Sequence, residues 1–444
     1  MKIKLWGILL AVACVSAQEN YSSWSHYKAI SINTTADTVN GGANVAATVA
    51  NFPLLVRLTA ANTDVFTQAT ANGADIRFTT SNGVTRLKHQ RERWDAVNHV
   101  AEFWVLVPSI AGYLLTTPIR MYWGKIGAAD SSNGAAVFDT VNGFRAVWHM
   151  NGGTGNETDA TVDGLVATNT GAPANNPSGA VGLARTFDGT TQYFTVLNSA
   201  TGVLNFHLTD NFTVSAWLYV AAVPAVAGSG IVIMNKGDNQ WTFEAQDNAA
   251  TPKYWVVEAR GNNTFLNARS TGFPTAGFPA VTANGSVGSW HHLMGTYKGA
   301  AVMGAIAETL FYDGNPISVS AYVNMNNNGR NENFNVFIGT LPSNTSPPNG
   351  ATLSRYWNGS LDELTVSKTV RSRDWVKLCY QTQKPGVNAV TLGTSLVPTA
   401  IIPSISKQSH SAKIFVSDVL GHKTRHGKAW KSGAKAEHRV TLIR

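Results

Sequence analysis

The chain has 444 residues, enough for two or three ordinary domains, and its hydrophobic content of 44% excludes wholesale disorder. No apolar run reaches the ~18 residues of a membrane-spanning helix, and two cysteines exclude a disulfide scaffold or a cysteine-rich zinc module. The net charge of +8 comes from the two ends of the chain. Residues 407–444 hold nine Lys/Arg against two Asp/Glu, and Lys2 and Lys4 add two more positive charges. The rest of the chain is nearly neutral, which argues against a nucleic-acid-binding protein.

Residues 1–17 are expected to be a cleavable export signal. Lys2 and Lys4 precede a short apolar run at residues 5–12, and Val15-Ser16-Ala17 offers small residues for cleavage after position 17. Lipoprotein processing at Cys14 is the alternative interpretation. We therefore expect an exported protein that is extracellular or at the cell surface, with the periplasm as the other location.

Residues 18–139 are expected to form a β-rich domain. Apolar and polar residues alternate in short segments such as 54–58 and 76–78, and Asn-Gly pairs at 72–73 and 82–83 indicate turns between them. Many short strands separated by such turns are typical of β-sandwiches.

Residues 140–393 continue this pattern as a second and larger block. Alternation recurs at 212–218 and 334–338, and Asp-Gly turns stand at 188–189 and 313–314. The predicted fold class is therefore all-β, with two β-sandwich or jelly-roll domains followed by a small C-terminal β tail.

Three features follow near the end of the chain. One short helix is expected near residues 372–383, where Cys379 is predicted to be a buried small side chain rather than a nucleophile. Proline and serine residues indicate a linker at 394–408. In the basic tail, 409–444, the segment Asp418-Val419-Leu420-Gly421 is similar to the carboxy-terminal sorting domains of some Gram-negative bacteria. The alternative is a basic arm attracted to anionic surface polymers or lipids.

The second block contains a series of motifs at Ala184–Gly189, Phe212–Trp217, Trp290–Tyr297, Leu310–Gly314, Phe337–Gly339, Trp357–Leu364 and Arg371–Trp375. Over roughly 240 residues these motifs follow the order found in LamG-like jelly-roll domains. The block therefore resembles that family, which belongs to the concanavalin A-like lectin and glucanase superfamily. The resemblance implies two packed antiparallel sheets, one of them concave.

The first block resembles a bacterial domain of unknown function that commonly precedes LamG-like domains. Its matching segments are Phe52–Leu58, Gly73–Phe78, Trp104-Val105 and Met121–Gly124. This resemblance implies a β-rich accessory domain and no particular chemistry.

The sequence carries no catalytic constellation that we recognise. The glucanases of the superfamily need a Glu-x-Asp-x-x-Glu strand that supplies a nucleophile and an acid, and that spacing is missing. Neither a Gly-x-Ser-x-Gly elbow nor a His-Glu-x-x-His motif occurs. We therefore predict a protein that is not an enzyme.

Asp362 is the main candidate for a metal ligand. A period of two places Asp362 on the same strand face as Leu364 and Val366, which should be the core. A buried carboxylate without a cation or several N–H donors is costly. The superfamily resemblance implies one structural Ca²⁺, held by an aspartate near this strand and by an early turn, here Asp188-Gly189. Satisfaction of the carboxylate by loop amides is the alternative.

Four residues are candidates for binding a carbohydrate. If the apolar residues of segments 241–245 and 254–260 face inward, then Glu244, Tyr254, Glu258 and Arg260 line a solvated sheet face. Planar rings stack on sugars, and carboxylate or guanidinium groups hydrogen-bond to hydroxyls. An ordinary solvated sheet face is the alternative.

Together these features predict an exported, non-catalytic glycan-binding or adhesion protein that acts through a lectin-like jelly roll. Its partner would be a carbohydrate or polysaccharide. The alternative is a structural or protein–protein interaction component of a cell-surface complex, and a degenerate glycoside hydrolase ranks third. Neither a nucleic-acid partner nor a transmembrane segment is expected, and the sequence does not indicate an oligomeric state.

Overall fold

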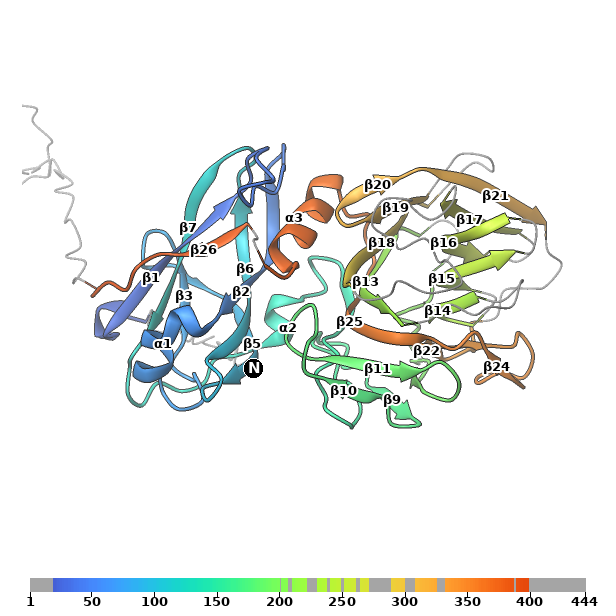
Figure 1. The fold of residues 1–444 in the computed structure, drawn as a ribbon, viewed down its shortest axis with the longest axis horizontal. Helices are drawn as coiled ribbons and strands as arrows, with labels where there is room; N and C mark the ends of the chain where they lie inside the picture. Colours follow the sequence, from blue (N-terminus) through green and yellow to red (C-terminus); the bar gives the residue numbers. More distant parts are fainter. Residues whose placement is uncertain are drawn as a thin grey trace, which may run out of the picture. The chain divides into compact units, whose positions relative to one another are not determined.

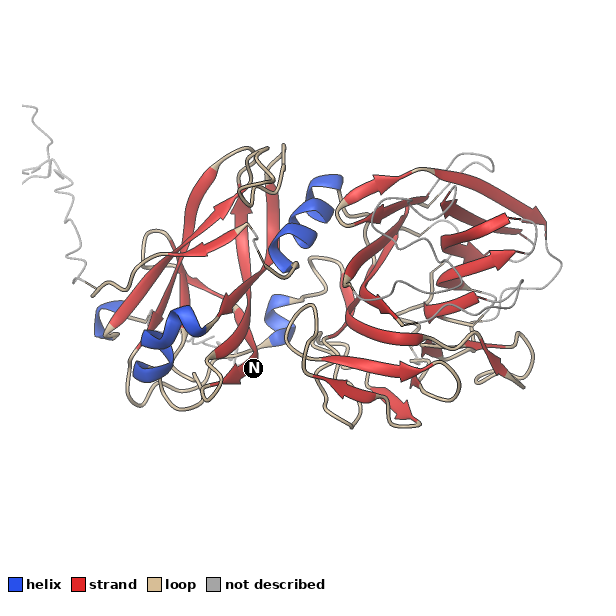
Figure 2. Cartoon of the chain, viewed as in Figure 1, coloured by secondary structure: helices blue, strands red, loops and turns tan. Residues whose placement is uncertain are grey.

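The structure is a computed structural model in which strands make up most of the regular elements (Figures 1 and 2). It describes residues 19–199, 201–206, 210–221, 230–237, 240–248, 251–260, 264–270, 289–299, 308–325, 332–386 and 389–398. Side chains are not described for residues 246–248, 251–254, 260, 264–270, 308 and 319–325. The predicted export signal at 1–17 and the basic tail at 409–444 lie outside the described residues.

The first domain is a sandwich of two antiparallel sheets. One sheet has the strand order β26 (Val390–Leu392), β1 (His26–Asn33), β7 (Leu115–Trp123), β3 (Arg77–Thr80) and β4 (Arg86–Leu87). The other has the order β2 (Val49–Leu58), β6 (Val100–Ile110) and β5 (His89–Asp95). The short helices here are η1 (Tyr21–Ser23), η2 (Ala60–Asn62), α1 (Thr63–Gln68) and α2 (Gly134–Val137). The predicted β-rich domain is confirmed.

The second domain is a larger sandwich of two eight-stranded sheets. The first, which we call the β25 sheet, contains β10 (Ala174–Asn176), β11 (Ala184–Asp188), β25 (Asn358–Ser367), β13 (Phe212–Val220), β18 (His291–Tyr297), β19 (Glu308–Tyr312) and β20 (Asn315–Ile317), with β8 (Phe144–Trp148) paired to β25. The second, the β15 sheet, contains β21 (Val319–Met325), β17 (Thr264–Ser270), β16 (Thr251–Arg260), β15 (Trp241–Asn248), β14 (Gly230–Asn235), β22 (Val336–Ile338), β12 (Tyr193–Val196) and β9 (Ala167–Thr170). A small hairpin adds β23 (Leu341–Pro342) and β24 (Leu353–Ser354).

Two hydrophobic cores organise these layers. One core lies between the β25 and β15 sheets and is filled by alternate residues of both, such as Val214 and Phe243. The other core lies inside the first sandwich and continues through Met294 and Phe311 on the outer face of the β25 sheet. The first domain therefore covers that outer face.

The predicted helix near 372–383 is α3 (Arg373–Gln383), and it joins the two domains. Ser372 caps its N-terminus by accepting a hydrogen bond from the Trp375 amide. Trp375, Val376, Leu378 and Cys379 of α3 belong to the core of the first domain. Cys379 is buried as predicted, and this burial raises the pKa of its thiol to about 12, so the thiol stays protonated and inert.

The second domain does not extend to the boundary expected at residue 393, because the strand before that residue belongs to a sheet of the first domain. After α3 the chain returns to the first domain, where Ile30, Ser31 and Ile32 of β1 pair with β26. Leu396 adds an isolated bridge to Tyr27 of the same strand. The first sandwich is thus closed by a strand that follows the second domain in the sequence, which composition alone does not indicate.

Acid should destabilise the first domain through His89. Burial, followed by the charges of Arg77 and Arg86, lowers the pKa of His89 to about 3, whereas an unfolded histidine titrates near 6.5. Between these two pH values the unfolded chain binds more protons than the folded chain. As the pH is lowered from 6.5 to 4, the free energy of unfolding therefore decreases by on the order of 3 kcal/mol. His89→Phe, which keeps ring contacts to Phe78 and Phe103, should flatten this dependence in denaturant titrations.

The control is His99→Phe at a partly exposed position, and it should leave the pH dependence unchanged. Equal slopes for wild type and His89→Phe would contradict the assignment.

Candidate functional site

Two of the predicted carbohydrate residues, Glu244 and Glu258, lie on the face of the β15 sheet that points away from its core. Phe243 and Val257 enter the core, as expected from the alternation, so Glu244 and Glu258 face the other way. Both carboxylates are buried, however, with each residue only 2% exposed. Glu244 forms an ion pair with Arg355 at 2.8 Å. The prediction that these two glutamates lie on a solvated sheet face is therefore wrong.

Tyr254 lies within strand β16, and Arg260 is the last residue of that strand. Tyr254 lies opposite Gln246, and Arg260 lies opposite Phe265 of β17. Their side chains lie outside the described residues, so their predicted role in sugar binding stays a prediction.

An open hollow of about 780 Å³ lies elsewhere on the outer face of the β15 sheet, over β9, β12 and β22. Phe194 of β12 enters the core, so Tyr193 and Thr195 face outward into the hollow. Thr170 and Thr168 of β9 stand opposite them in register. The strand pairing therefore forms a patch of three hydroxyls beside one tyrosine ring.

Aromatic and amide groups complete this hollow. The Tyr193 ring centroid lies 6.2 Å from Phe337 and 6.4 Å from Tyr356. Three asparagines rim the hollow, and Asn335 holds them together by accepting from the Asn198 amide at 2.8 Å and donating to Asn349 at 2.7 Å. Flat rings beside fixed amides and hydroxyls are groups that suit a polyhydroxylated ligand.

The expected calcium ligands are not brought together. Asp188 lies opposite Asn358 in the pairing of β11 with β25, four positions from Asp362 along β25. The Asp188 carboxylate accepts from the amides of Thr190, Thr191 and Gln192, and these bonds lower its pKa although burial acts in the opposite sense. A Cβ at Gly189 would meet the Asn358 side chain. Asp188 is thus satisfied by its own turn, and calcium binding stays a prediction.

Asp362 does not face the sandwich core, which corrects the expectation from the period of two. Leu361, Leu364 and Val366 all enter that core, so the alternation is broken between positions 361 and 364. A β-bulge lies there, because Thr365 pairs with Ser215 while Asp362 pairs with Trp217. The bulge turns Asp362 and Glu363 to the outer face, and Glu363 has a left-handed backbone with φ 46°.

A second bulge lies in the first domain and presents Glu92 to the same region. In β5, Arg91 pairs with Phe103 and Arg93 pairs with Glu102, which leaves Glu92 as the extra residue. Its side chain is completely buried. Both domains thus use an irregular strand to place a glutamate at the surface where they meet.

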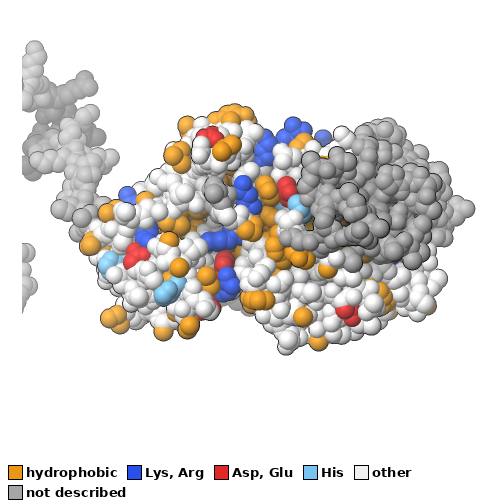
Figure 3. All heavy atoms as spheres, in the orientation of Figure 1, with side chains coloured by type: hydrophobic (Ala, Val, Ile, Leu, Met, Phe, Trp, Pro, Cys, Tyr) orange, Lys and Arg blue, Asp and Glu red, His pale blue; other side chains and the backbone are white. Residues whose placement is uncertain are grey.

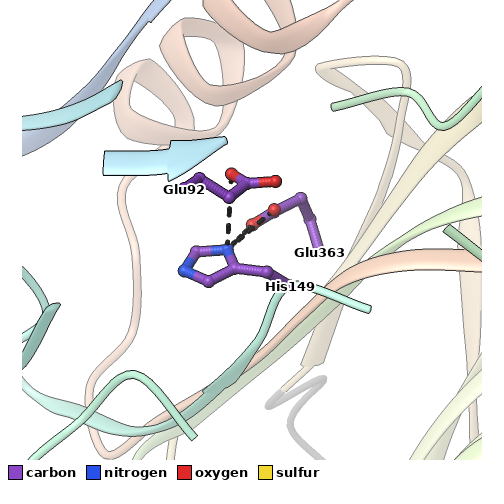
Figure 4. A group of neighbouring side chains, drawn as sticks. All are labelled: Glu92, His149 and Glu363. Atoms are coloured by element: carbon purple, nitrogen blue, oxygen red, sulfur yellow. Dashed lines mark hydrogen bonds and ion pairs between the residues drawn. The ribbon is translucent and has the colours of Figure 1, made fainter. Parts of the chain in front are cut away.

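His149, which follows β8, lies beside both glutamates, and one of its ring nitrogens faces each of them (Figure 4). Its Nδ1 is 2.8 Å from Glu363 Oε1 and 3.7 Å from Glu92 Oε2. Its Nε2 lies 3.2 Å from Gln90 Oε1. The Trp104 ring stacks on the imidazole, and its Nε1 donates to Glu92 Oε2 at 2.6 Å. We call Glu92, His149 and Glu363 the interdomain cluster.

Arginines surround the interdomain cluster. Arg93 binds Glu102 through two hydrogen bonds of 2.6 and 2.7 Å. Arg57 of β2 donates to the carbonyl oxygens of Ala180 and Gln383, so one guanidinium bridges the first domain to the second domain and to α3. On the face drawn in Figure 3, basic and acidic side chains gather along the boundary between the domains.

Burial controls the ionisation of these groups. It raises the pKa of Glu92, Asp362 and Glu363 well above their ordinary values, and mutual repulsion of the carboxylates adds to the effect for Glu92 and Asp362. Burial also lowers the pKa of His149 against the pull of Glu92. Carboxylates this close and this buried hold protons or a cation.

The sequence analysis missed both the hollow and the interdomain cluster. The Thr-x-Thr spacing at 168–170 and the alternation of Tyr193 and Thr195 were available as signals for the hollow. The interdomain cluster joins positions 92, 149 and 363, and nothing in their spacing places them in contact.

Comparison with known proteins identifies both domains. Residues 72–151 match the family model described as Domain of unknown function (DUF2341), and residues 188–377 match the model described as Concanavalin A-like lectin/glucanases superfamily. The chain carries these two domains in the order that its motifs indicate. A search of curated proteins gave no match.

Several solved structures are similar to part of the chain. The binding domain of Paraclostridial Mosquitocidal Protein 1 aligns with a TM-score of 0.39 at 13% identity, over 55% of this chain and 53% of that chain. The binding domain of Botulinum neurotoxin DC, in complex with rat synaptotagmin II, aligns with a TM-score of 0.39 at 10% identity, over 56% and 53%. The alignment thus spans about half the length of each of these structures.

Removing the Arg57 guanidinium should destabilise the protein strongly. Arg57→Met leaves buried carboxylates and carbonyl oxygens without their cation, and loss of one partner from a buried charge network costs about 3–5 kcal/mol. Arg86→Met is the control, because Arg86 is 44% exposed and makes a 3.5 Å ion pair with Glu19 that is worth at most about 1 kcal/mol. Urea unfolding of both variants measures the difference, and equal losses would contradict a bridging role for Arg57.

Proposed function

We propose that the protein is an exported glycan-binding or adhesion protein that uses the hollow over β9, β12 and β22 as its ligand site. The observation that carries this proposal is the Tyr193 ring on an open sheet face, flanked by the hydroxyls of Thr168, Thr170 and Thr195. A sugar presents an apolar face to an aromatic ring and hydroxyls to fixed polar groups. The concanavalin A-like second domain supports a binding role in general.

The location of the hollow also supports this role. The outer face of the β25 sheet is covered by the first domain and α3, as shown by Trp217, whose Nε1 donates to Gln383 and whose ring stacks on Tyr380. The hollow is larger than two other cavities among the described residues, one of about 230 Å³ beside His89 and one of about 30 Å³ beside Glu363. The cavity beside Glu363 has room for one or two water molecules and not for a sugar ring.

Export and surface location belong to the same proposal. The signal-like pattern at residues 1–17 and the family of the second domain support it. No helix among the described residues is long and apolar enough to cross a membrane. A component of a cell-surface complex that binds proteins through the same hollow is the alternative function.

Tyr193→Ala should weaken glycan binding by about tenfold or more, since loss of a stacked ring removes on the order of 1.4 kcal/mol. A glycan array with the full chain identifies the ligand, and calorimetry with that ligand measures the change. Tyr113→Ala is the matched control, because Tyr113 is 53% exposed on the loop between β6 and β7 of the first domain.

Two results would redirect the proposal. Binding that survives Tyr193→Ala but is lost in Tyr254→Ala or Arg260→Ala would place the site on β16. Binding to no glycan, with capture of a surface protein that Tyr193→Ala abolishes, would favour the alternative function.

The protein should release no reducing sugar from β-glucans. Retaining glycosidases need two carboxyl groups about 5–5.5 Å apart and inverting enzymes about 6.5–9.5 Å apart, flanking the sugar. Glu244 and Glu363 lie on opposite outer faces of the second sandwich, with its core between them. A reducing-sugar assay checks the prediction. Turnover that disappears in Glu244→Gln or Glu363→Gln would overturn it.

A further inference from the structure

Three potential metal ligands converge where the two domains meet. One ligand atom from each of Glu92, His149 and Glu363 can be chosen so that all lie within 4.8 Å of one another. They come from the β5 bulge, from the residue after β8, and from the β25 bulge. In Figure 4 dashed lines run from the Nδ1 side of the imidazole to both Glu363 and Glu92.

One tautomer of His149 directs a lone pair at the carboxylates. When Nε2 donates its proton to Gln90 Oε1 over 3.2 Å, Nδ1 of the neutral ring faces Glu363 Oε1 at 2.8 Å and Oε2 at 3.0 Å without a proton of its own. In that tautomer, either a proton on the carboxyl group or a cation must lie between Nδ1 and the carboxylate oxygens.

The charges of the surrounding residues do not supply such a cation. Four buried or half-buried carboxylates meet here, from Glu92, Glu102, Asp362 and Glu363, against the guanidinium groups of Arg57 and Arg93. Arg93 is bound to Glu102, and Arg57 donates to backbone carbonyl oxygens. With all four carboxylates ionised, two negative charges remain among the described residues of this interface, and protons or a bound cation must neutralise them.

Two carboxylate oxygens in this region also have no hydrogen-bond partner. Oε1 of Glu92 and Oδ1 of Asp362 are both buried and both unpaired. A loop of the second domain closes over them: the Val181 amide donates to the other Asp362 oxygen at 2.8 Å, and a Cβ at Gly182 would lie 2.7 Å from Glu92 Oε1. Gly182 has a φ of 60°, so glycine is favoured there by its backbone as well as by the close approach.

We propose that the interdomain cluster binds one divalent metal ion of the zinc type, which clamps the two domains together. Imidazole nitrogen with carboxylate oxygens is a donor set that suits zinc, whereas calcium and magnesium prefer oxygen ligands alone. Ligands of a tetrahedral zinc ion lie about 3.3 Å apart, and the distances from Nδ1 to the two glutamates, 2.8 and 3.7 Å, bracket that value.

The surrounding residues already have the positions that outer groups of a metal site occupy. Gln90 Oε1 can accept from Nε2 of His149, which favours the tautomer whose Nδ1 binds a metal, and the Trp104 indole holds Glu92. Glu363 and Trp104 also line a cavity of about 30 Å³, which can hold a water molecule. This site is distinct from the predicted calcium site, because Glu92, His149 and Glu363 take no part in that prediction.

The test uses the full chain, stripped with a chelator and then titrated with Zn²⁺. Calorimetry and elemental analysis should give one zinc per chain that depends on the cluster, and Zn²⁺ in excess should raise the melting temperature by about 5 °C. Ca²⁺ and Mg²⁺ at the same concentration should give no stabilisation that His149→Gln abolishes. Co²⁺ should give the visible bands of a tetrahedral site.

Two variants and one control separate a metal site from a structural effect. His149→Gln and Glu92→Gln should each lose the stoichiometric zinc and the cobalt bands. His291→Gln is the control, because His291 forms a comparable pair with Asp313 at 2.8 Å away from the cluster, and it should keep both signals. Circular dichroism identifies any variant that fails to fold, and for such a variant the cobalt titration of the other variant decides.

Three results would overturn the proposal. The first is a wild-type melting temperature that does not respond to Zn²⁺. The second is zinc that persists in both His149→Gln and Glu92→Gln, which would place it on other histidines. The third is stabilisation by Ca²⁺ that equals that by Zn²⁺ and is lost in His149→Gln.

Discussion

The structure depends on charge removed from water where the first domain covers the β25 sheet. Taking a carboxylate or a guanidinium out of water costs several kcal/mol, and only well-aligned partners offset that cost. Arg93 and Glu102 satisfy each other within the first domain, while Arg57 reaches carbonyl groups of α3 and of the loop at Ala180. The two domains are therefore expected to behave as one unit, because separating them would strand these groups.

Irregular strands make this arrangement reachable. A regular β25 would send Asp362 and Leu364 to the same face, and the core would then have to accept a carboxylate. The bulge at Glu363 keeps Leu361 and Leu364 inside and turns both acids outward, at the price of a left-handed residue. The bulge in β5 places Glu92 at the same interface from the first domain. Both bulges therefore bring acids to one interface, which regular strands would not do.

Much of the fold could be predicted from the sequence, because alternation and turn residues are local signals. The all-β class, the helix ending in Gln383, the buried Cys379 and the inward set at Phe243 and Val257 are all confirmed. The failed predictions have two causes. The first is a bulge, which shifts the alternation by one residue and which no sequence pattern indicated, so the predicted direction of the Asp362 side chain was wrong. The second cause is contact between segments far apart in the sequence, such as the pairing of Arg355 with Glu244 and of β26 with β1.

The covering of the β25 sheet also determines where a ligand can bind. A sandwich offers two outer faces and its loops, and here one face is used for domain docking. The outer face of the β15 sheet remains available for a ligand. Among its described residues, the outward side chains of β15 and β16 differ in exposure from those of β9 and β12. Glu244 and Glu258 are buried, with Glu244 held by Arg355, whereas Thr168 and Thr170 are exposed beside Tyr193. A clamp at the docked face and a binding hollow on the other sheet are compatible, because the core between the two sheets separates them.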